Sequence, residues 1–306
     1  MEFMKERDLG GVLPVFQMPY DDSENIDFNT LEKEIDWLYE NECDGIVFAL
    51  ASEIIRLTEM ERKKVAEKIC KYNKDRGCVI VSVGGESTFQ AIEFAKHAQD
   101  SGADAVMAIP PISNPCPEDQ IKQYYEDILS SIQIPLVVQD ASGYLGNSMS
   151  IELQSYLFNN FPEKILFKPE SNPIGPRLSE LRDATSGEAP IFEGSGGIAL
   201  VDSFKRGIKG TMPGSDLIDI IEALWKALLE GNESRIYKIS FPLSSFISIL
   251  TSLDAFLTIE KYILVKRGIF KNSIIRKPCN YKLDLETNKE VDIIFKKLTE
   301  ALDSND

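Results

Sequence analysis

Lys168 lies within residues 165–170, ILFKPE, a pattern that predicts a buried strand ending in a polar turn. Lysine side chains are almost never fully buried unless they are paired. Burial disfavours the charged ammonium form, and the neutral amine attacks carbonyl carbons to form an imine. Lys168 is therefore a candidate nucleophile toward a keto group. The alternative is a lysine at a strand end whose ammonium group extends into solvent.

Glu170 follows Lys168 by two residues, and residues at this spacing on a strand point to the same face. Their Cα atoms are expected to lie roughly 6–7 Å apart. A carboxylate beside an imine can remove a proton from the adjacent carbon and then protonate a leaving hydroxyl. The pair predicts a lyase in which Lys168 is the nucleophile and Glu170 the acid–base group. A same-face salt bridge is the alternative.

Short apolar runs alternate with longer amphipathic segments along most of the chain. The predicted strands cover residues 11–16, 45–50, 79–83, 105–109, 135–139, 165–170, 191–194 and 208–212. Helical patterns lie at residues 28–41, 87–101, 150–160, 174–184, 199–206 and 215–230, and two more begin near Thr58 and Pro117. Eight such units predict a (β/α)8 barrel over residues 1–232. Lys168 would then lie at the carboxyl end of the sixth strand, where barrels place their active sites.

Residues 233–306 form a separate C-terminal helical region in this interpretation. Residues 234–266 are rich in Leu, Ile and Phe, and residues 287–303 predict another amphipathic helix. The region either packs on the barrel or forms an oligomer contact, and the sequence leaves both open.

Composition excludes several classes of function. The 306 residues include 33 Lys and Arg against 49 Asp and Glu, a net charge of -16 that argues against nucleic acid or an anionic membrane as partner. Five cysteines without a CxxC motif predict reduced thiols in a cytoplasmic protein, and no signal peptide or membrane span is expected. His97 is the only histidine, so a multi-histidine zinc site is excluded, and we expect no metal and no cofactor.

The order of elements, with a lysine on the sixth strand, resembles the dihydrodipicolinate synthase / N-acetylneuraminate lyase family. The segments that carry the resemblance are residues 10–16, 52–53, 110–111, 166–170, 193–197 and 210–214, and it extends over roughly residues 8 to 300. The resemblance implies a class I Schiff-base lyase with a (β/α)8 fold that acts on pyruvate or another 2-keto acid. It also implies a homo-oligomer, a tetramer or a dimer.

Two departures distinguish this chain from the synthase pattern. The family's Tyr-Tyr pair after strand four is replaced by Pro111-Ile112, and its Gly-Thr-Thr-Gly-Glu after strand two is replaced by residues 49–53, ALASE. The segments VQDA at residues 138–141 and Lys168-x-Glu170 resemble the 2-keto-3-deoxy sugar-acid dehydratases more closely. That resemblance implies that Glu170 replaces the missing tyrosine, and it favours a hydro-lyase. A pyruvate-dependent aldolase or a synthase-like enzyme is the alternative.

The candidate substrate-binding residues end a predicted strand or begin the loop after it. They are Ser52, Asp140, Gly194, Ser195, Gly196 and Met212. Ser52 and the backbone N–H groups of its loop are candidates for the substrate carboxylate, and the glycine-rich turn at residues 193–197 is a candidate anion site. Turn or cap roles are the alternatives for these residues. Two rival functions also remain, a non-catalytic binding barrel and a phosphate-binding barrel enzyme.

Overall fold

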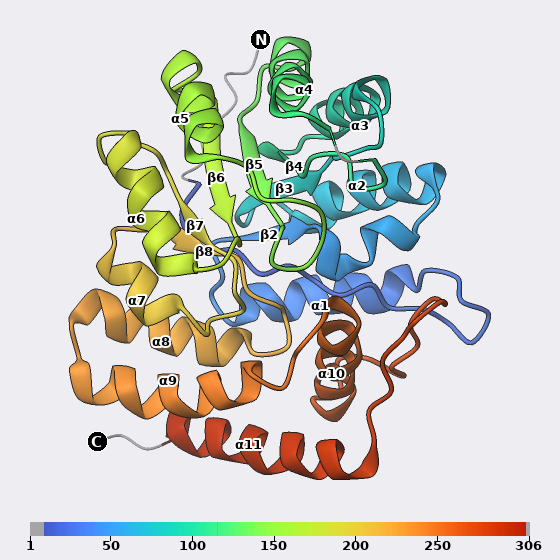
Figure 1. Cartoon of the computed structure of the whole chain (residues 1–306). Coiled ribbons are helices and arrows are strands. Elements are labelled where there is room, and N and C mark those ends of the chain that lie inside the picture. The colour runs from blue at the N-terminus through green and yellow to red at the C-terminus, as the bar shows by residue number, and fades with distance from the viewer. Residues whose placement is uncertain (1–8, 115, 304–306) are drawn as a thin grey trace.

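Eight parallel strands close into a barrel in the computed structural model, which describes residues 9–114 and 116–303 (Figure 1). They are β1 (Gly11–Val12), β2 (Gly45–Phe48), β3 (Cys78–Ser82), β4 (Ala105–Ala108), β5 (Leu136–Asp140), β6 (Ile165–Pro169), β7 (Phe192–Glu193) and β8 (Gly210–Thr211). β2 to β6 pair in order, and β8 pairs with both β7 and β1. The bridges Val15–Val47 and Phe167–Ile191 join the two sets of strands into one ring. The predicted (β/α)8 fold is confirmed.

Helices follow the strands and surround the barrel (Figure 1). They are α1 (Phe28–Glu40), α2 (Glu59–Asn73), α3 (Thr88–Asp100), α4 (Glu118–Ser131), α5 (Ile151–Asn160), α6 (Ile174–Ala184), α7 (Leu200–Lys205) and α8 (Ile218–Glu230), with two 3-10 turns, η1 (Leu50–Ser52) and η2 (Ile54–Arg56), after β2. Side chains that hydrogen-bond to the first backbone N–H groups mark where some of these helices start. Thr58 and Glu61 form the predicted capping box of α2, and the Ser87 side chain accepts from the backbone N–H of Gln90 at the start of α3.

Alternation along the strands separates two apolar cores. One set of side chains, which includes Val47, Ile80, Met107, Val137 and Leu166, fills the barrel interior. The larger core lies between the strands and the surrounding helices. Side chains two residues apart on a strand share a face. Counting on in twos from these interior residues toward the end of each strand therefore gives the side chains that reach the barrel mouth.

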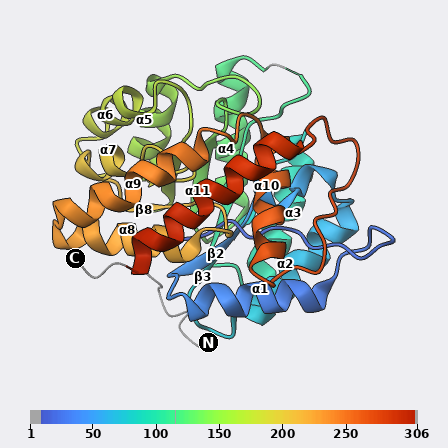
Figure 2. The same ribbon diagram turned by 90° about the horizontal axis from the view of Figure 1, so that it is seen from below.

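As far as residue 303, where the described part of the chain ends, the C-terminal region contains three helices, α9 (Glu233–Ile247), α10 (Leu253–Lys266) and α11 (Leu285–Asp303). The predicted helical stretch 234–266 is broken at residues 248–252, where the Ser252 side chain caps α10 by accepting from the N–H of Ala255. α9 packs on α8, and α11 runs across α9 and α8 (Figure 2). This region therefore packs on the barrel. Its treatment as a unit separate from residues 1–232 stays a prediction.

α10 is attached to the loop after β2 by a fully buried ion pair. The Lys261 ammonium contacts the Glu53 carboxylate and donates to the Ile274 carbonyl oxygen at 2.7 Å. Glu53 lies between η1 and η2 with a left-handed φ of 56°, a conformation that non-glycine residues adopt at an energetic cost. The pair thus fixes the strained loop that begins at the end of β2.

No helix in the part of the chain that the structure describes is long and apolar enough to cross a lipid bilayer.

Replacing Lys261 by Met tests this attachment. The substitution removes the ammonium partner of the buried Glu53 carboxylate and leaves it Arg56, at 3.6 Å, and the Arg276 N–H, so we expect the free energy of unfolding to fall by about 3 kcal/mol. Urea denaturation measures it. Lys226→Met, which removes a surface ion pair with Glu42, is the matched control and should unfold like the wild type. Equal stability of Lys261→Met and the wild type would show that the pair does not hold α10 to the barrel.

Candidate active site

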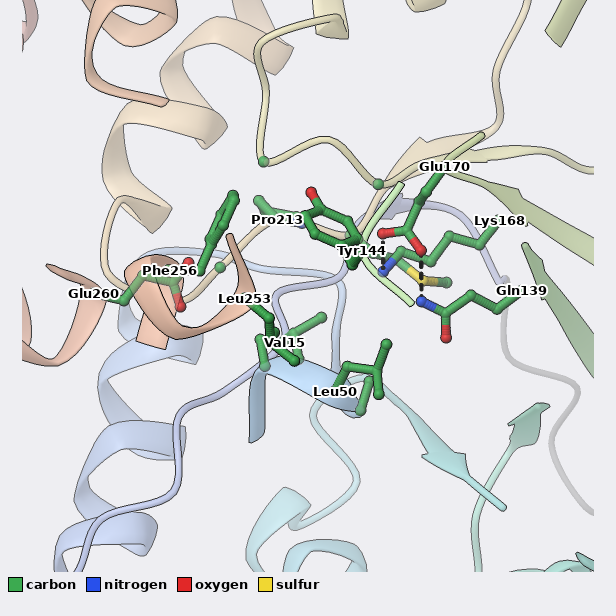
Figure 3. Close-up of a pocket in the computed structure, with 16 residues that line it drawn as sticks. Val15, Leu50, Gln139, Tyr144, Lys168, Glu170, Pro213, Leu253, Phe256 and Glu260 are labelled. Carbon is green, nitrogen blue, oxygen red and sulfur yellow. Dashed lines mark hydrogen bonds and ion pairs between the residues drawn. The ribbon is translucent and has the colours of Figure 1, made fainter. Parts of the chain in front are cut away.

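A pocket opens at the carboxyl end of the barrel, between the strand ends and α10 (Figure 3). Of the predicted site residues, Lys168, Glu170, Gly194, Gly196 and Met212 line it. The cavity has a volume of about 50 Å³, room for a few water molecules.

Lys168 and Glu170 meet in this pocket as the strand geometry predicted. Leu166, Lys168 and Glu170 follow one another at a spacing of two, and Leu166 belongs to the barrel interior. The Lys168 Nζ lies 3.2 Å from the Glu170 Oε1, and the two residues are only 4% and 5% exposed. The amine therefore faces the cavity with a carboxyl group beside it.

Gln139 holds the other oxygen of the Glu170 carboxyl group. The Gln139 Nε2 donates to the Glu170 Oε2 at 2.6 Å from the neighbouring strand β5. Burial raises the pKa of Glu170, while the Lys168 ammonium and the Gln139 hydrogen bond act in the opposite direction. A carboxyl group whose pKa is raised in this way exchanges protons closer to neutral pH than an exposed glutamate.

Gly194 has no side chain, and this leaves room for the side chains of Lys168 and Glu170. A Cβ atom at residue 194 would lie 2.6 Å from the Lys168 Cε and 2.8 Å from the Glu170 Cγ, closer than real side-chain contacts. Gly194 thus acts through close backbone approach, and Gly196 and Met212 line the cavity near it.

The structure does not bring the Ser52 side chain into the pocket. Its hydroxyl donates to the Phe16 carbonyl oxygen at 2.5 Å and accepts from the Ala49 N–H at 3.3 Å. Leu50 and Ala51 line the pocket beside it. Ser52 therefore shapes the loop, and the backbone of that loop meets the cavity. Direct contact between Ser52 and a substrate stays a prediction.

Asp140 and Ser195 are also committed to neighbouring groups. The Asp140 carboxylate accepts from the backbone N–H groups of Ser142 and Met149, each at 3.1 Å. The Ser195 N–H and hydroxyl both donate to the carboxylate of Glu193. The predicted anion site at this glycine-rich turn therefore holds a carboxylate of the chain itself.

Several pocket residues were missed from the sequence, among them Tyr144, Phe256 and Glu260. Tyr144 reaches the cavity from the loop after β5, and its ring packs edge-on against Phe256 of α10 with centroids 5.8 Å apart (Figure 3). Burial, followed by the nearby Glu170 carboxylate, raises the pKa of the Tyr144 phenol, so the phenol remains a hydrogen-bond donor. Glu260, also on α10, lines the pocket as a second acid. Glu260 and Lys261 were detectable as two charged residues inside an apolar helical pattern.

Within residues 9–114 and 116–303, no group of three or more His, Cys, Asp or Glu side chains is arranged to hold a metal ion.

A family model matches nearly the whole chain. The model of the dihydrodipicolinate synthetase family covers residues 8–298. The chain is also 33% identical over 174 residues to a 4-hydroxy-tetrahydrodipicolinate synthase of Methanococcus vannielii. That match covers 56% of this chain and 60% of the length of the curated relative.

Solved structures agree with the barrel. A dihydrodipicolinate synthase from Rhodopseudomonas palustris superimposes with a TM-score of 0.86 at 26% identity, covering 94% of this chain and 97% of that one. A sialic acid aldolase from Ruminococcus gnavus superimposes with a TM-score of 0.85 at 24% identity, covering 95% and 97%. The second likeness, at this identity, shows the fold alone.

Gly194→Ala tests the close approach at Lys168. The added methyl group displaces the lysine side chain, and overpacking of this kind costs about 1–3 kcal/mol. If Lys168 forms the imine with a 2-keto acid that is proposed below, we therefore expect borohydride reduction in the presence of pyruvate to modify it about 5- to 150-fold more slowly. Peptide mass spectrometry measures the rate. Gly10→Ala is the control, because a Cβ there meets only the Lys209 side chain and backbone at 3.1 Å or more. Modification of Gly194→Ala at the wild-type rate would refute the steric account.

Proposed function

The chain belongs to the dihydrodipicolinate synthetase family, and on that basis we propose that it is a Schiff-base lyase acting on a short 2-keto acid such as pyruvate. The observation that carries the proposal is the buried Lys168 amine facing the pocket from β6, 3.2 Å from the Glu170 carboxyl group. The sequence match spans only part of the synthase relative, so the activity rests on this geometry as well.

Lys168 supplies the amine. Its Nζ attacks the ketone carbon of the 2-keto acid and forms a carbinolamine, which loses water to give an iminium ion. Glu170 is close enough to accept the proton that the ammonium form must lose first. The iminium ion then draws electrons from the neighbouring C3–H bond, so a weak base suffices for its removal.

The substrate carboxylate binds to the loop after β2 in this proposal. Leu50 and Ala51 begin the 3-10 turn η1, and the first N–H groups of a helical turn have no partner within it. Lys168 is the only basic residue among the described residues that line the pocket. Backbone donors must therefore supply much of the recognition of the carboxylate.

Glu170 removes the C3 proton, and the enamine that results has two possible fates. In an aldolase or synthase, C3 of the enamine adds to the carbonyl group of a second substrate. The reverse reaction breaks the C3–C4 bond and gives the same enamine. In a dehydratase a hydroxyl leaves from C4 after Glu170 protonates it. The names of the synthase relatives support the first fate better than the hydro-lyase that the motifs predicted. We therefore place carbon–carbon bond chemistry first.

The dehydratase remains a second candidate because of the charges in the pocket. A dipicolinate carries two carboxylates, as its name states, and the described lining offers a single cation for both. Glu170, held by Gln139 beside Lys168, provides the acid–base group that water elimination requires. Tyr144 adds a phenol donor that serves either reaction.

We also propose that the protein works in the cytoplasm as a homo-oligomer. Five free cysteines within the described residues suit a reducing compartment. Membership of the family supports the oligomer.

Borohydride trapping tests the proposed function. Incubation with pyruvate and then borohydride should add one reduced pyruvate to the Lys168 peptide, as read by mass spectrometry. Lys168→Met should give no adduct. Glu170→Gln should still be trapped but should exchange the C3 protons of pyruvate with D₂O at least about 100-fold more slowly, as read by NMR. Folded wild-type protein that forms no adduct with pyruvate or 2-keto-3-deoxypentonate would exclude the lyase.

The raised pKa of Glu170 predicts a pH dependence. Glu170 acts as a base only when it is ionised, so the rate of C3 exchange falls as the pH drops through its pKa. This fall on the acid side of the pH–rate profile, the acid limb, should lie at a higher pH than the pKa of an exposed glutamate. Gln139→Leu removes a hydrogen bond that favours the carboxylate and should move the limb to higher pH.

The buried Gln154 of α5, which lies outside the pocket, is the matched control for that substitution. Gln154→Leu should leave the acid limb where it is in the wild type. An acid limb that does not move in Gln139→Leu would remove Glu170 from the role of base.

A further inference from the structure

Glu260 lines the end of the pocket opposite Lys168. α10 carries it into the cavity, and Figure 3 shows its carboxyl group on the far side of the cavity from the Lys168–Glu170 pair. The residue is buried, with 1% of its surface exposed. The chemistry derived above uses Lys168 and Glu170 and leaves this second acid without a role.

The two oxygens of Glu260 have different surroundings. The Gln17 side-chain amide donates to the Oε2. The Oε1 has no hydrogen-bond partner among the described residues, and it lies against Gly214, another residue of the pocket lining. A Cβ at residue 214 would overlap with the Glu260 carboxyl group, so glycine is what leaves the Oε1 room. One oxygen is thus held by the protein and the other is available to a ligand.

No described cation forms an ion pair with Glu260. Lys261, the next residue, is bound to Glu53 and to the Ile274 carbonyl oxygen. Arg267, directly after the last residue of α10, pairs with Asp219. The polar partner of the buried Glu260 carboxyl group is therefore the neutral amide of Gln17.

Two further buried carboxyl groups surround it. Glu34 on α1 accepts from the Gln17 N–H at 2.9 Å and from the Ser215 hydroxyl at 2.7 Å, and its other oxygen has no partner among the described residues. Asp216, after β8, likewise has one oxygen without a partner in the described chain.

Burial raises the pKa of Glu34 to about 8 and that of Asp216 to about 7. It also raises the pKa of Glu260 well above its usual range, with Asp216 and Glu34 adding to the effect and Gln17 opposing it. A neutral Glu260 carries one proton. Because the Oε2 accepts from Gln17, that proton lies on the Oε1, on the side of the cavity.

We propose that Glu260 donates a hydrogen bond to a hydroxyl oxygen on the distal carbon of the 2-keto acid and so selects hydroxylated chains over plain alkyl chains. This inference rests on the proposed function, since it requires the keto end of the substrate to be bound at Lys168. Val15, Leu253 and Phe256 form apolar walls between the two ends, so the part of the substrate between them contacts carbon atoms. A distal carboxylate is disfavoured, because Glu260 offers it no cation.

Matched pairs of 2-keto acids that differ by one hydroxyl test the selection. The pairs are 2-ketobutyrate with 4-hydroxy-2-ketobutyrate and 2-ketovalerate with 5-hydroxy-2-ketovalerate. The concentration that gives half-maximal borohydride trapping on Lys168 is measured for each by mass. We expect wild-type protein to prefer the hydroxylated member of at least one pair by about tenfold. The pair of acids that shows the preference indicates which carbon of the substrate, C4 or C5, carries the hydroxyl that Glu260 contacts.

Two substitutions separate a neutral donor from an ionised carboxylate. Glu260→Gln keeps an N–H donor directed at the cavity and should retain the preference. Glu260→Leu removes the donor and should reduce the ratio to about one. Glu222→Gln is the matched control, because Glu222 is a buried acid on α8 outside this pocket whose pKa burial raises to about 8. It should keep the wild-type ratio.

Pyruvate trapping in the same series keeps the two proposals apart. If the wild type traps pyruvate but prefers neither hydroxylated acid, the role of Glu260 is refuted and the lyase stands. The same holds if Glu260→Leu keeps the preference or if Glu260→Gln loses it. If the wild type traps no 2-keto acid, the proposed function fails and the inference fails with it. Should Glu260→Leu not fold, the wild-type ratio and Glu260→Gln decide.

Discussion

The buried ion pair between Lys168 and Glu170 is the interaction on which the site depends. Removing an ammonium and a carboxylate from water costs several kcal/mol per ion, and their attraction offsets that cost only when the geometry is good and further hydrogen bonds are made. Both conditions are met. The Nζ–Oε1 distance is 3.2 Å, and Gln139 satisfies the other carboxylate oxygen. Gly194 contributes by having no side chain, because a Cβ at that residue would occupy the space of both partners.

The C-terminal helices complete the site that the barrel begins. Glu260 and Lys261 are adjacent on α10, and neighbouring residues on a helix point about 100° apart. One side chain therefore reaches the pocket while the next pairs with Glu53 in the loop after β2. Leu50 and Ala51, which belong to that loop, also line the pocket. The position of α10 and the shape of the proposed carboxylate site are thus physically linked.

The barrel and its lysine were predictable because they follow from periodicity. Eight apolar runs gave the strands, and a spacing of two placed Lys168 and Glu170 on one face. The roles of Ser52 and Asp140 were not predictable. Whether a loop side chain points at a ligand or at a backbone group depends on dihedral angles that composition does not specify. Glu260 is separated from Lys168 by most of the C-terminal half of the chain, and no local pattern shows that α10 turns toward the pocket. The break at residues 248–252 inside the predicted helical stretch was also missed, because the sequence shows it only as Ser252, the N-cap of α10, before an apolar run.

The distribution of charge in the pocket limits what the enzyme can bind more narrowly than membership of the family does. A protein with a net charge of -16 must attract an anionic keto acid by local groups. In the proposed mechanism Lys168 does so twice, first as an ammonium ion and then as part of a positively charged iminium ion beside the substrate's own carboxylate. One carboxylate is thereby neutralised without any other basic residue in the described lining. A second carboxylate on the same substrate would lie among Glu170, Glu260 and the apolar walls with no second cation to pair with, which is costly in a buried site. The proposed imine rests on membership of the family and on the buried lysine, while the acids around it favour a reaction partner or a leaving group that is neutral.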